Sequence, residues 1–277
     1  MPTAPQPAPL TPPNWQAQLA TRSAFLDVTL VAGLIGLAGA AGSGVATDLP
    51  RALLTLLLAL CAHAGDIRSG AAANALLLVA IPAGLWLGAQ SPGGAIAVAL
   101  GSVILGRAYS AAPGRRPGHG LDELAILAGV WLVVAGADHL QRGAFSPVPI
   151  LAGLPYALLA AALGYLQPFA VRNADLGQRA LVTRLGRDTA KWGFLMLCLA
   201  AYMTLVFAIE RNALPQKSAV AAFTLVLSFR AARDLIAHAG EPGALAGATR
   251  LTRIATPLHG LLLASALAFA PWPSPLR

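Results

Sequence analysis

A polar segment between two apolar runs carries the densest set of charged side chains in the chain. Between Arg172 and Lys191 there are five basic residues and two acids. Carboxylates bind hard cations such as Mg²⁺, and arginine side chains bind phosphate oxygens through paired hydrogen bonds. This mixture would suit a diphosphate held by Mg²⁺ and arginine at a membrane surface. A solvated basic loop is the alternative interpretation, and these residues alone do not exclude it.

A second polar segment, residues 107–124, precedes another apolar run. It contains Tyr109, Arg115 and Arg116 and ends with Asp122 and Glu123. An aromatic residue at the end of a span is typical of the membrane interface, and an acid pair is favoured at a helix N-terminus. The two arginines add cations that could bind the same anionic group.

The composition indicates that the elements on either side of these polar segments are strongly apolar. The chain has 277 residues, of which 57% are hydrophobic and 11% charged, and its mean hydropathy is +0.67. Soluble domains carry about 25% charged residues, so a soluble enzyme, a disordered chain and a coiled coil are all disfavoured. Cys61 and Cys198 lie in apolar runs, which excludes a disulfide scaffold.

Nine apolar runs come close to the roughly 20 residues that a membrane-spanning helix needs. The second run is short and ends near His63, a polar residue that would face a cavity or the interface. The sequence therefore predicts an all-α integral membrane protein with nine transmembrane helices. The runs are residues 24–46, 52–65, 71–89, 93–109, 124–140, 147–171, 192–209, 219–237 and 254–271.

The proline-rich residues 1–20 are predicted to form a disordered tail, and residues 21–277 a single membrane domain. Trp15 to Arg22 could equally form a short helix along the interface. Asp27 lies one turn into the first run, where an acid is a functional candidate by default, although so near the end it could reach the interface. Asp138 and His139, at the far end of the fifth run, are predicted to form a solvated boundary.

The basic residues fall unevenly on the two sides of this frame. If the nine runs alternate, 14 of the 19 lysines and arginines lie on one side. The positive-inside rule then places the N-terminus and the loops after spans 2, 4, 6 and 8 in the cytoplasm, as in a bacterial inner-membrane protein. The net charge of +8 is thereby explained by topology and lipid headgroup contacts. Because no loop combines aromatic and basic residues in a platform, nucleic acid is not an expected partner.

Several segments, taken in order, resemble one family. Tyr109-Ser-x-x-Pro-x-Arg115 followed by Gly-Leu-x-Glu-Leu, and Arg179 to Gly186, resemble segments of UbiA-type membrane prenyltransferases. The pattern is most similar to the 1,4-dihydroxy-2-naphthoate polyprenyltransferase-like branch. Thr21 to Leu30 resembles the entry of that branch's first helix, and His259-Gly260 its last helix. The similar segments extend from about residue 21 to residue 270.

The resemblance implies a nine-helix bundle that moves a polyprenyl group from its diphosphate to a small aromatic or quinone-precursor acceptor. In this family, Asp-rich motifs on the loops after helices 2 and 6 bind Mg²⁺ and the diphosphate. The C–O bond then ionises to an allylic cation, which the acceptor attacks. By this resemblance Asp66 and Asp175 are the expected catalytic, metal-binding residues. The diphosphate would be bound by Arg115, Arg116, Arg172, Arg179, Arg184 and Tyr109, with Asn173, Gln167 and His63 in auxiliary roles.

The chain also departs from the family pattern. The first motif has no Asn-Asp pair, and only Asp66 remains in the short segment between the second and third runs. In the second motif Asp175 remains, while the first acidic position falls near Val171. Two divalent ions bridging a diphosphate need several carboxylates. An alternative function is therefore a catalytically degenerate family member that binds a prenyl lipid or a partner membrane enzyme.

Overall fold

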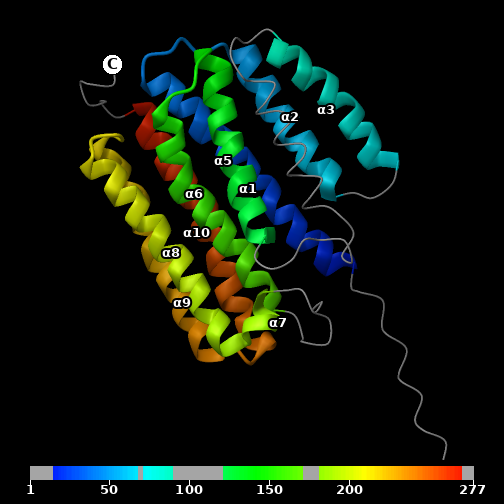
Figure 1. Ribbon diagram of the computed structural model, residues 1–277, viewed down its shortest axis with the longest axis vertical. Coiled ribbons are helices and arrows are strands. Elements are labelled where there is room, and N and C mark those ends of the chain that lie inside the picture. The colour runs from blue at the N-terminus through cyan, green and yellow to red at the C-terminus, as the bar shows by residue number, and fades with distance from the viewer. Residues whose placement is uncertain (1–14, 68–70, 90–120, 171–180, 270–277) are drawn as a thin grey trace, which may run out of the picture.

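The computed structural model describes residues 15–67, 71–89, 121–170 and 181–269, and side chains in 25–61, 78–89, 123–170 and 181–269. Every regular element in these ranges is helical, and together they form a bundle of long helices (Figure 1). The α-helices are α1 (Trp15–Gly42), α2 (Leu49–Ile67), α3 (Ala71–Ala89), α5 (Leu121–Arg142), α6 (Pro147–Leu166), α7 (Leu181–Leu185), α8 (Arg187–Glu210), α9 (Leu225–His238) and α10 (Ala246–Phe269). Three 3₁₀ helices, η1 (Gln167–Ala170), η3 (Gln216–Thr224) and η4 (Pro242–Leu245), join them.

The helices confirm the predicted all-α membrane class. Five segments of the described chain are long and apolar enough to cross a bilayer: Phe25–Gly42, Glu123–Arg142, Pro147–Ala170, Arg187–Glu210 and Pro242–Phe269. The apolar parts of α2 and α3 are shorter, at Leu49–Cys61 and Leu78–Ala89. The predicted run 93–109 lies outside the described residues. The count of nine transmembrane helices therefore stays a prediction.

Helix boundaries follow the apolar runs closely in some places and not in others. The run 71–89 coincides with α3. Helix α1 begins at Trp15, earlier than the expected start of the membrane domain at residue 21, and continues to Gly42. A short helix of Trp15–Arg22 along the interface stays a prediction. Residues 1–14 lie outside the described part, so the rest of the disordered tail stays a prediction.

Helix α6 is the central helix of the bundle. It contributes to two hydrophobic cores, one shared with α1, α5 and α10 and the other with α8, α9 and α10. Helices α2 and α3 lie on one side of this centre, and α8 and α9 lie on the other (Figure 1). Small residues allow the central helices to approach closely. The Tyr156 hydroxyl adds a hydrogen bond of 3.0 Å from α6 to the Val28 carbonyl oxygen of α1.

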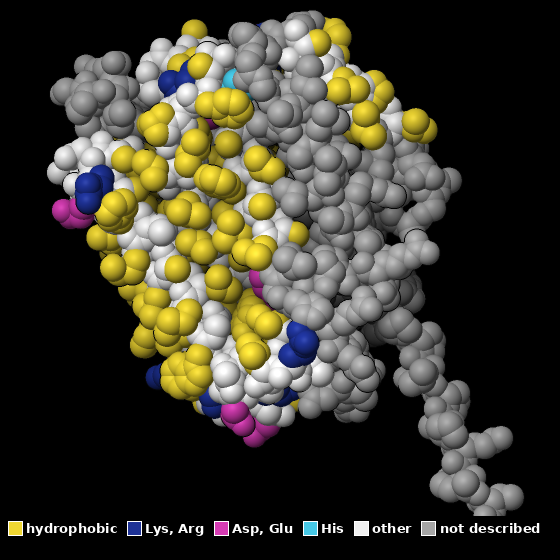
Figure 2. All heavy atoms as spheres, in the orientation of Figure 1, with side chains coloured by type: hydrophobic (Ala, Val, Ile, Leu, Met, Phe, Trp, Pro, Cys, Tyr) yellow, Lys and Arg dark blue, Asp and Glu magenta, His cyan; other side chains and the backbone are white. Residues whose placement is uncertain are grey.

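The surface agrees with a membrane environment. Hydrophobic side chains cover much of the described part of the visible face, and most charged side chains there lie toward its edges and ends (Figure 2). The exposed apolar side chains include Val206 and Phe207 on α8 and Val226 and Phe229 on α9. Apolar side chains exposed along the length of a helix are suited to contact with lipid.

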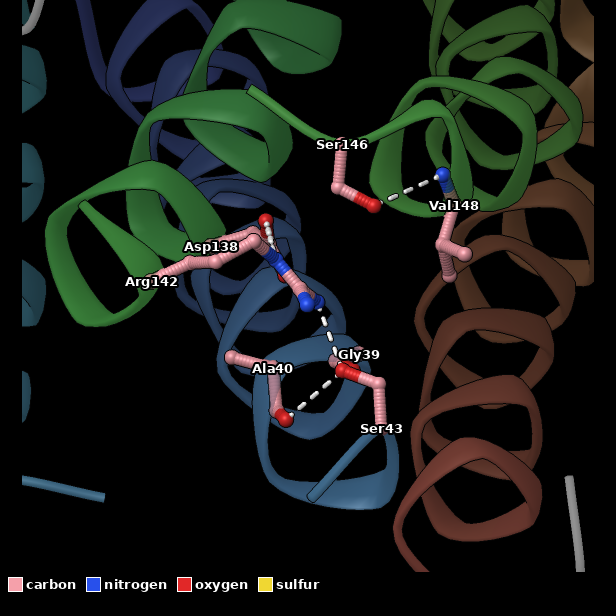
Figure 3. Close-up of polar contacts among 7 residues, drawn as sticks. All are labelled: Gly39, Ala40, Ser43, Asp138, Arg142, Ser146 and Val148. Carbon is pink, nitrogen blue, oxygen red and sulfur yellow. Dashed lines mark hydrogen bonds and ion pairs between the residues drawn. The ribbon is translucent and has the colours of Figure 1, made fainter. Parts of the chain in front are cut away.

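The prediction of a solvated boundary at Asp138 and His139 is wrong, because both residues are fully buried. Asp138 forms a two-point ion pair with Arg142, with nitrogen–oxygen distances of 3.0 and 2.9 Å. The same guanidinium donates to Ser43 Oγ at 2.6 Å and so connects α5 to the end of α1 (Figure 3). Ser146 lies beside this cluster at the start of α6, where its hydroxyl accepts a hydrogen bond from the Val148 amide.

Candidate functional site

A cavity of about 730 Å³ opens at the end of the bundle where α10 begins. Its walls come from α1, from the short helices η1 and η4, and from the first three turns of α10. The lining residues are Asp27, Ala170, Pro242, Gly243, Ala246, Thr249, Arg250, Arg253 and Ile254. Helix α7 and the turn between α9 and α10 lie toward the same end of the bundle (Figure 1).

Most polar residues that line the cavity lie on one face of α10. Thr249, Arg250 and Arg253 are spaced so that one helix carries all three toward the same opening, since residues three and four apart lie on one helix face. Asp27 contributes a carboxylate from α1. The side chains of Arg250, Arg253 and Asp27 are exposed and can therefore reach a ligand from solution.

The charge balance of the cavity favours an anionic ligand. Among the described residues that line it are two guanidinium groups and one carboxylate, which together carry one net positive charge. Arginine pairs bind phosphate groups through several parallel hydrogen bonds. The Thr249 hydroxyl donates instead to the Leu245 carbonyl oxygen at 3.0 Å. Ile254, Ala246 and Ala170 supply an apolar border to the same opening. This arrangement can hold a phosphate group beside an apolar chain.

A single arginine fixes the backbone around the cavity. Arg187, the first residue of α8, donates from Nη1 to the Phe169 carbonyl oxygen at 2.7 Å and to the Ala239 carbonyl oxygen at 3.1 Å. These two bonds connect η1, which carries the cavity residue Ala170, to the end of α9. Gly186 precedes α8 with a φ of 75°, a conformation that glycine adopts without steric cost.

The structure describes only part of the site predicted from the sequence. Gln167 begins η1, the same short helix that carries Ala170, and is half-buried. Arg184 is exposed on α7 and does not line the cavity. His63 and Asp66 lie in the last turns of α2, which therefore extends beyond the predicted end of the second run at residue 65. The remaining predicted site residues lie outside the described ranges: Tyr109, Arg115, Arg116, Arg172, Asn173, Asp175 and Arg179.

Two cavity residues were missed as ligand contacts from sequence alone. Arg250 and Arg253 were counted only toward the positive side of the membrane frame. The signal available in the sequence is that these two arginines are three residues apart, directly before the last apolar run and on its positively charged side. Asp27 is a candidate from the sequence, and the structure places it in the lining of the same cavity as the two arginines.

The described side chains do not by themselves form a magnesium site. Within the described ranges, no group of three or more His, Cys, Asp or Glu side chains is arranged to hold a metal ion. The described lining of the cavity includes one carboxylate, that of Asp27, and Mg²⁺ in proteins is usually bound by carboxylates together with substrate phosphates. A metal at this end of the bundle would need further acids from segments that the structure does not describe.

Comparisons with known proteins support the fold. No protein-family model matches the sequence, and no curated protein matches it. Among solved structures, the chain is similar to a digeranylgeranylglyceryl phosphate synthase in membranes, with a TM-score of 0.69 and 12% sequence identity. The match covers 91% of this chain and 99% of the synthase chain. The protein thus shares the fold of a membrane synthase over almost its whole length.

Proposed function

We propose that this protein is an intramembrane prenyltransferase of the UbiA type, which moves a polyprenyl group from its diphosphate to a small acceptor. The observation that carries the proposal is the fold shared with a digeranylgeranylglyceryl phosphate synthase over nearly the full length of both chains. The cationic cavity supports it, because a prenyl diphosphate combines a phosphate anion with an apolar chain.

In this proposal the diphosphate lies at the cavity, and Arg250 and Arg253 bind its oxygens. The bond between the allylic carbon and oxygen breaks, and the diphosphate leaves with the electron pair. The two guanidinium groups favour this step because they stabilise the charge that develops on the leaving group. The nucleophilic atom of the acceptor forms the new bond to the allylic carbon and loses its proton to solvent. We take the acceptor to be an aromatic, quinone-precursor-like compound, as the sequence resemblance implies.

The proposal retains a role for the two degenerate motifs. Asp66 and Asp175 would hold Mg²⁺, and Arg115, Arg116, Arg172 and Arg179 would surround the phosphates together with the cavity arginines. The N-terminus and the cavity would face the cytoplasm of a bacterial cell, in accord with the uneven distribution of basic residues.

The experiment is a transfer assay with the purified protein in lipid nanodiscs, using labelled geranylgeranyl diphosphate and a panel of aromatic and glycerol-phosphate acceptors. Incorporation of label into an aromatic compound would support the proposed aromatic acceptor. Incorporation only into a glycerol phosphate would show that the acceptor is a glycerol phosphate and not an aromatic compound.

Removing the two cavity arginines should weaken binding of the diphosphate. In Arg250→Gln/Arg253→Gln, each lost charge-assisted hydrogen bond removes about 1.5–3 kcal/mol. With every 1.4 kcal/mol worth tenfold, we expect the Kd for geranylgeranyl diphosphate to rise at least tenfold. The measurement is equilibrium binding of the labelled compound to protein in nanodiscs.

The matched control is Lys217→Gln, which removes an exposed cation at the opposite end of the bundle, in η3. This variant should bind the diphosphate as the unaltered protein does. Equal binding by the double arginine variant and the control would exclude the cavity as the phosphate site.

A further inference from the structure

A chain of buried polar side chains crosses the second half of the bundle. The Tyr202 hydroxyl of α8 lies 3.0 Å from Thr224 Oγ1 and 2.8 Å from Ser228 Oγ. Thr224 Oγ1 lies 3.1 Å from Nδ1 of His259 on α10, and the same nitrogen lies 3.1 Å from the Ala221 carbonyl oxygen. Tyr202, Thr224, Ser228 and His259 are all buried. His259 belongs to a segment singled out in the sequence, and the proposed prenyl transfer gives it no role.

The backbone carbonyl decides which ring nitrogen of His259 carries the proton. A carbonyl oxygen can only accept a hydrogen bond, so the Ala221 oxygen requires a hydrogen on Nδ1. The Thr224 hydroxyl donates to the same oxygen at 2.7 Å and therefore offers Nδ1 only a lone pair. An unpaired charge is costly in such a buried place, which makes the neutral ring the favoured form. In that form Nε2 has no hydrogen and is a hydrogen-bond acceptor.

Nε2 of His259 has no hydrogen-bond partner within the described part of the chain, and neither has the buried hydroxyl of Ser218. Ser218, Ala221 and Thr224 recur every three residues along η3 and are its buried residues, so they share one face of this 3₁₀ helix. The ring of His259 is bonded to two members of that face. A buried polar atom without a hydrogen-bond partner destabilises the folded protein, because it has lost its hydrogen bonds to water. The two atoms belong to η3 and α10, which pack against each other, and a buried polar atom without a partner in each of two packed elements points to a ligand between them.

The backbone of η3 is an independent sign of a specialised place. It forms a 3₁₀ helix of 9 residues, whereas such helices seldom exceed three or four residues. A 3₁₀ stretch that runs directly into an α-helix, as η3 runs into α9, often marks a functional hinge or a sequence under strain. The unusual backbone and the two unpartnered polar atoms occur in the same element and its contact with α10.

We propose that Nε2 of His259 and the hydroxyl of Ser218 are the two anchors of a buried binding site for one hydroxyl group between η3 and α10. The ligand donates its O–H to Nε2, and its oxygen accepts the hydrogen of Ser218. Either a water molecule or the hydroxyl of a lipid-soluble compound has this chemistry. The site does not depend on prenyl transfer and would be present in an inactive member of the same fold.

Nuclear magnetic resonance of the full chain in nanodiscs, with ¹⁵N-labelled histidine, tests the proposal. The His259 signals are assigned by their loss in His259→Gln, since the chain has 5 histidines. We expect a protonated Nδ1 and an unprotonated Nε2 whose chemical shift is that of a hydrogen-bonded acceptor. Ser218→Ala should move the Nε2 signal toward that of a free acceptor. The control is Ser265→Ala, which removes an exposed hydroxyl from α10 and should leave the signal unchanged.

The two sources of the hydroxyl give different results in the same samples. Magnetisation transfer from water protons to the His259 ring, lost in Ser218→Ala, identifies water. If there is no such transfer, a hydroxyl-bearing lipid that copurifies with the unaltered protein and is depleted in Ser218→Ala identifies a lipid-soluble ligand. A protonated Nε2, or a Nε2 signal that Ser218→Ala does not change, would overturn the proposal.

Discussion

Replacing Gly260 by leucine is expected to prevent the central helices from packing and to abolish a stable fold. A Cβ atom at this position would meet Val31 Cγ1 of α1 and two ring carbons of Tyr156 on α6, at 2.5 and 2.9 Å. Tyr156 cannot move aside, because it is fully buried and its hydroxyl is bonded to the Val28 carbonyl. Even Gly260→Ala overpacks this contact, and such changes typically cost about 1–3 kcal/mol.

The measurement is thermal unfolding in detergent, with size-exclusion chromatography to detect aggregated protein. Gly247→Ala is the matched control, since it lies on the same helix and a Cβ there meets nothing within 4 Å. Alanine favours a helix over glycine by up to about 1 kcal/mol, so this control should be as stable as the unaltered protein or slightly more so. An unchanged Tm for Gly260→Ala would contradict the described contact between α1, α6 and α10.

The second large effect is expected at the ion pair between Asp138 and Arg142. Asp138→Ala leaves the Arg142 guanidinium, only 20% exposed, without its carboxylate. Removing one partner of a buried ion pair costs about 3–5 kcal/mol, because the remaining charge stays poorly solvated. The bond from Arg142 to Ser43 would also lose its fixed geometry, and with it a connection between α1 and α5. We expect a strongly lowered Tm.

Two further variants distinguish a buried ion pair from a general effect of charge. Asp188→Ala removes the carboxylate of an ion pair on α8 whose acid is 97% exposed, and should change stability little. Asp138→Leu/Arg142→Met removes both charges and should recover part of the loss. If Asp138→Ala were as stable as Asp188→Ala, the carboxylate of Asp138 would have to lie in solvent.

The sequence predicted the helical membrane class because that information is local. Long apolar runs determine where a helix lies, and the run 71–89 coincides with α3. Predictions about individual polar residues were less successful because they depend on neighbours far along the chain. Asp138 has the sequence context of a span end, and only the packing of α5 on α1 places Ser43 beside its partner Arg142.

The candidate site shows the same limit. Arg250 and Arg253 line a cavity together with Asp27 because α1 packs against α10, two helices from opposite ends of the sequence. The sequence around Arg187 is rich in basic residues and suggests a solvated loop, but its guanidinium donates hydrogen bonds to the carbonyl oxygens of Phe169 and Ala239. His259 was recognisable as part of a motif, whereas the state of its ring depends on the carbonyl of Ala221.

The most direct test of prenyl transfer is a time course of diphosphate release from geranylgeranyl diphosphate, with the prenylated product measured in the same samples. The purified protein is used in nanodiscs with aromatic acceptors and Mg²⁺. We expect diphosphate and product to appear in equal amounts, and we expect Asp175→Ala and the Arg250→Gln/Arg253→Gln variant to lower both at least tenfold. Tight binding of the substrate without any release of diphosphate, with every acceptor tried, would contradict the enzymatic function and identify a protein that only binds prenyl lipids.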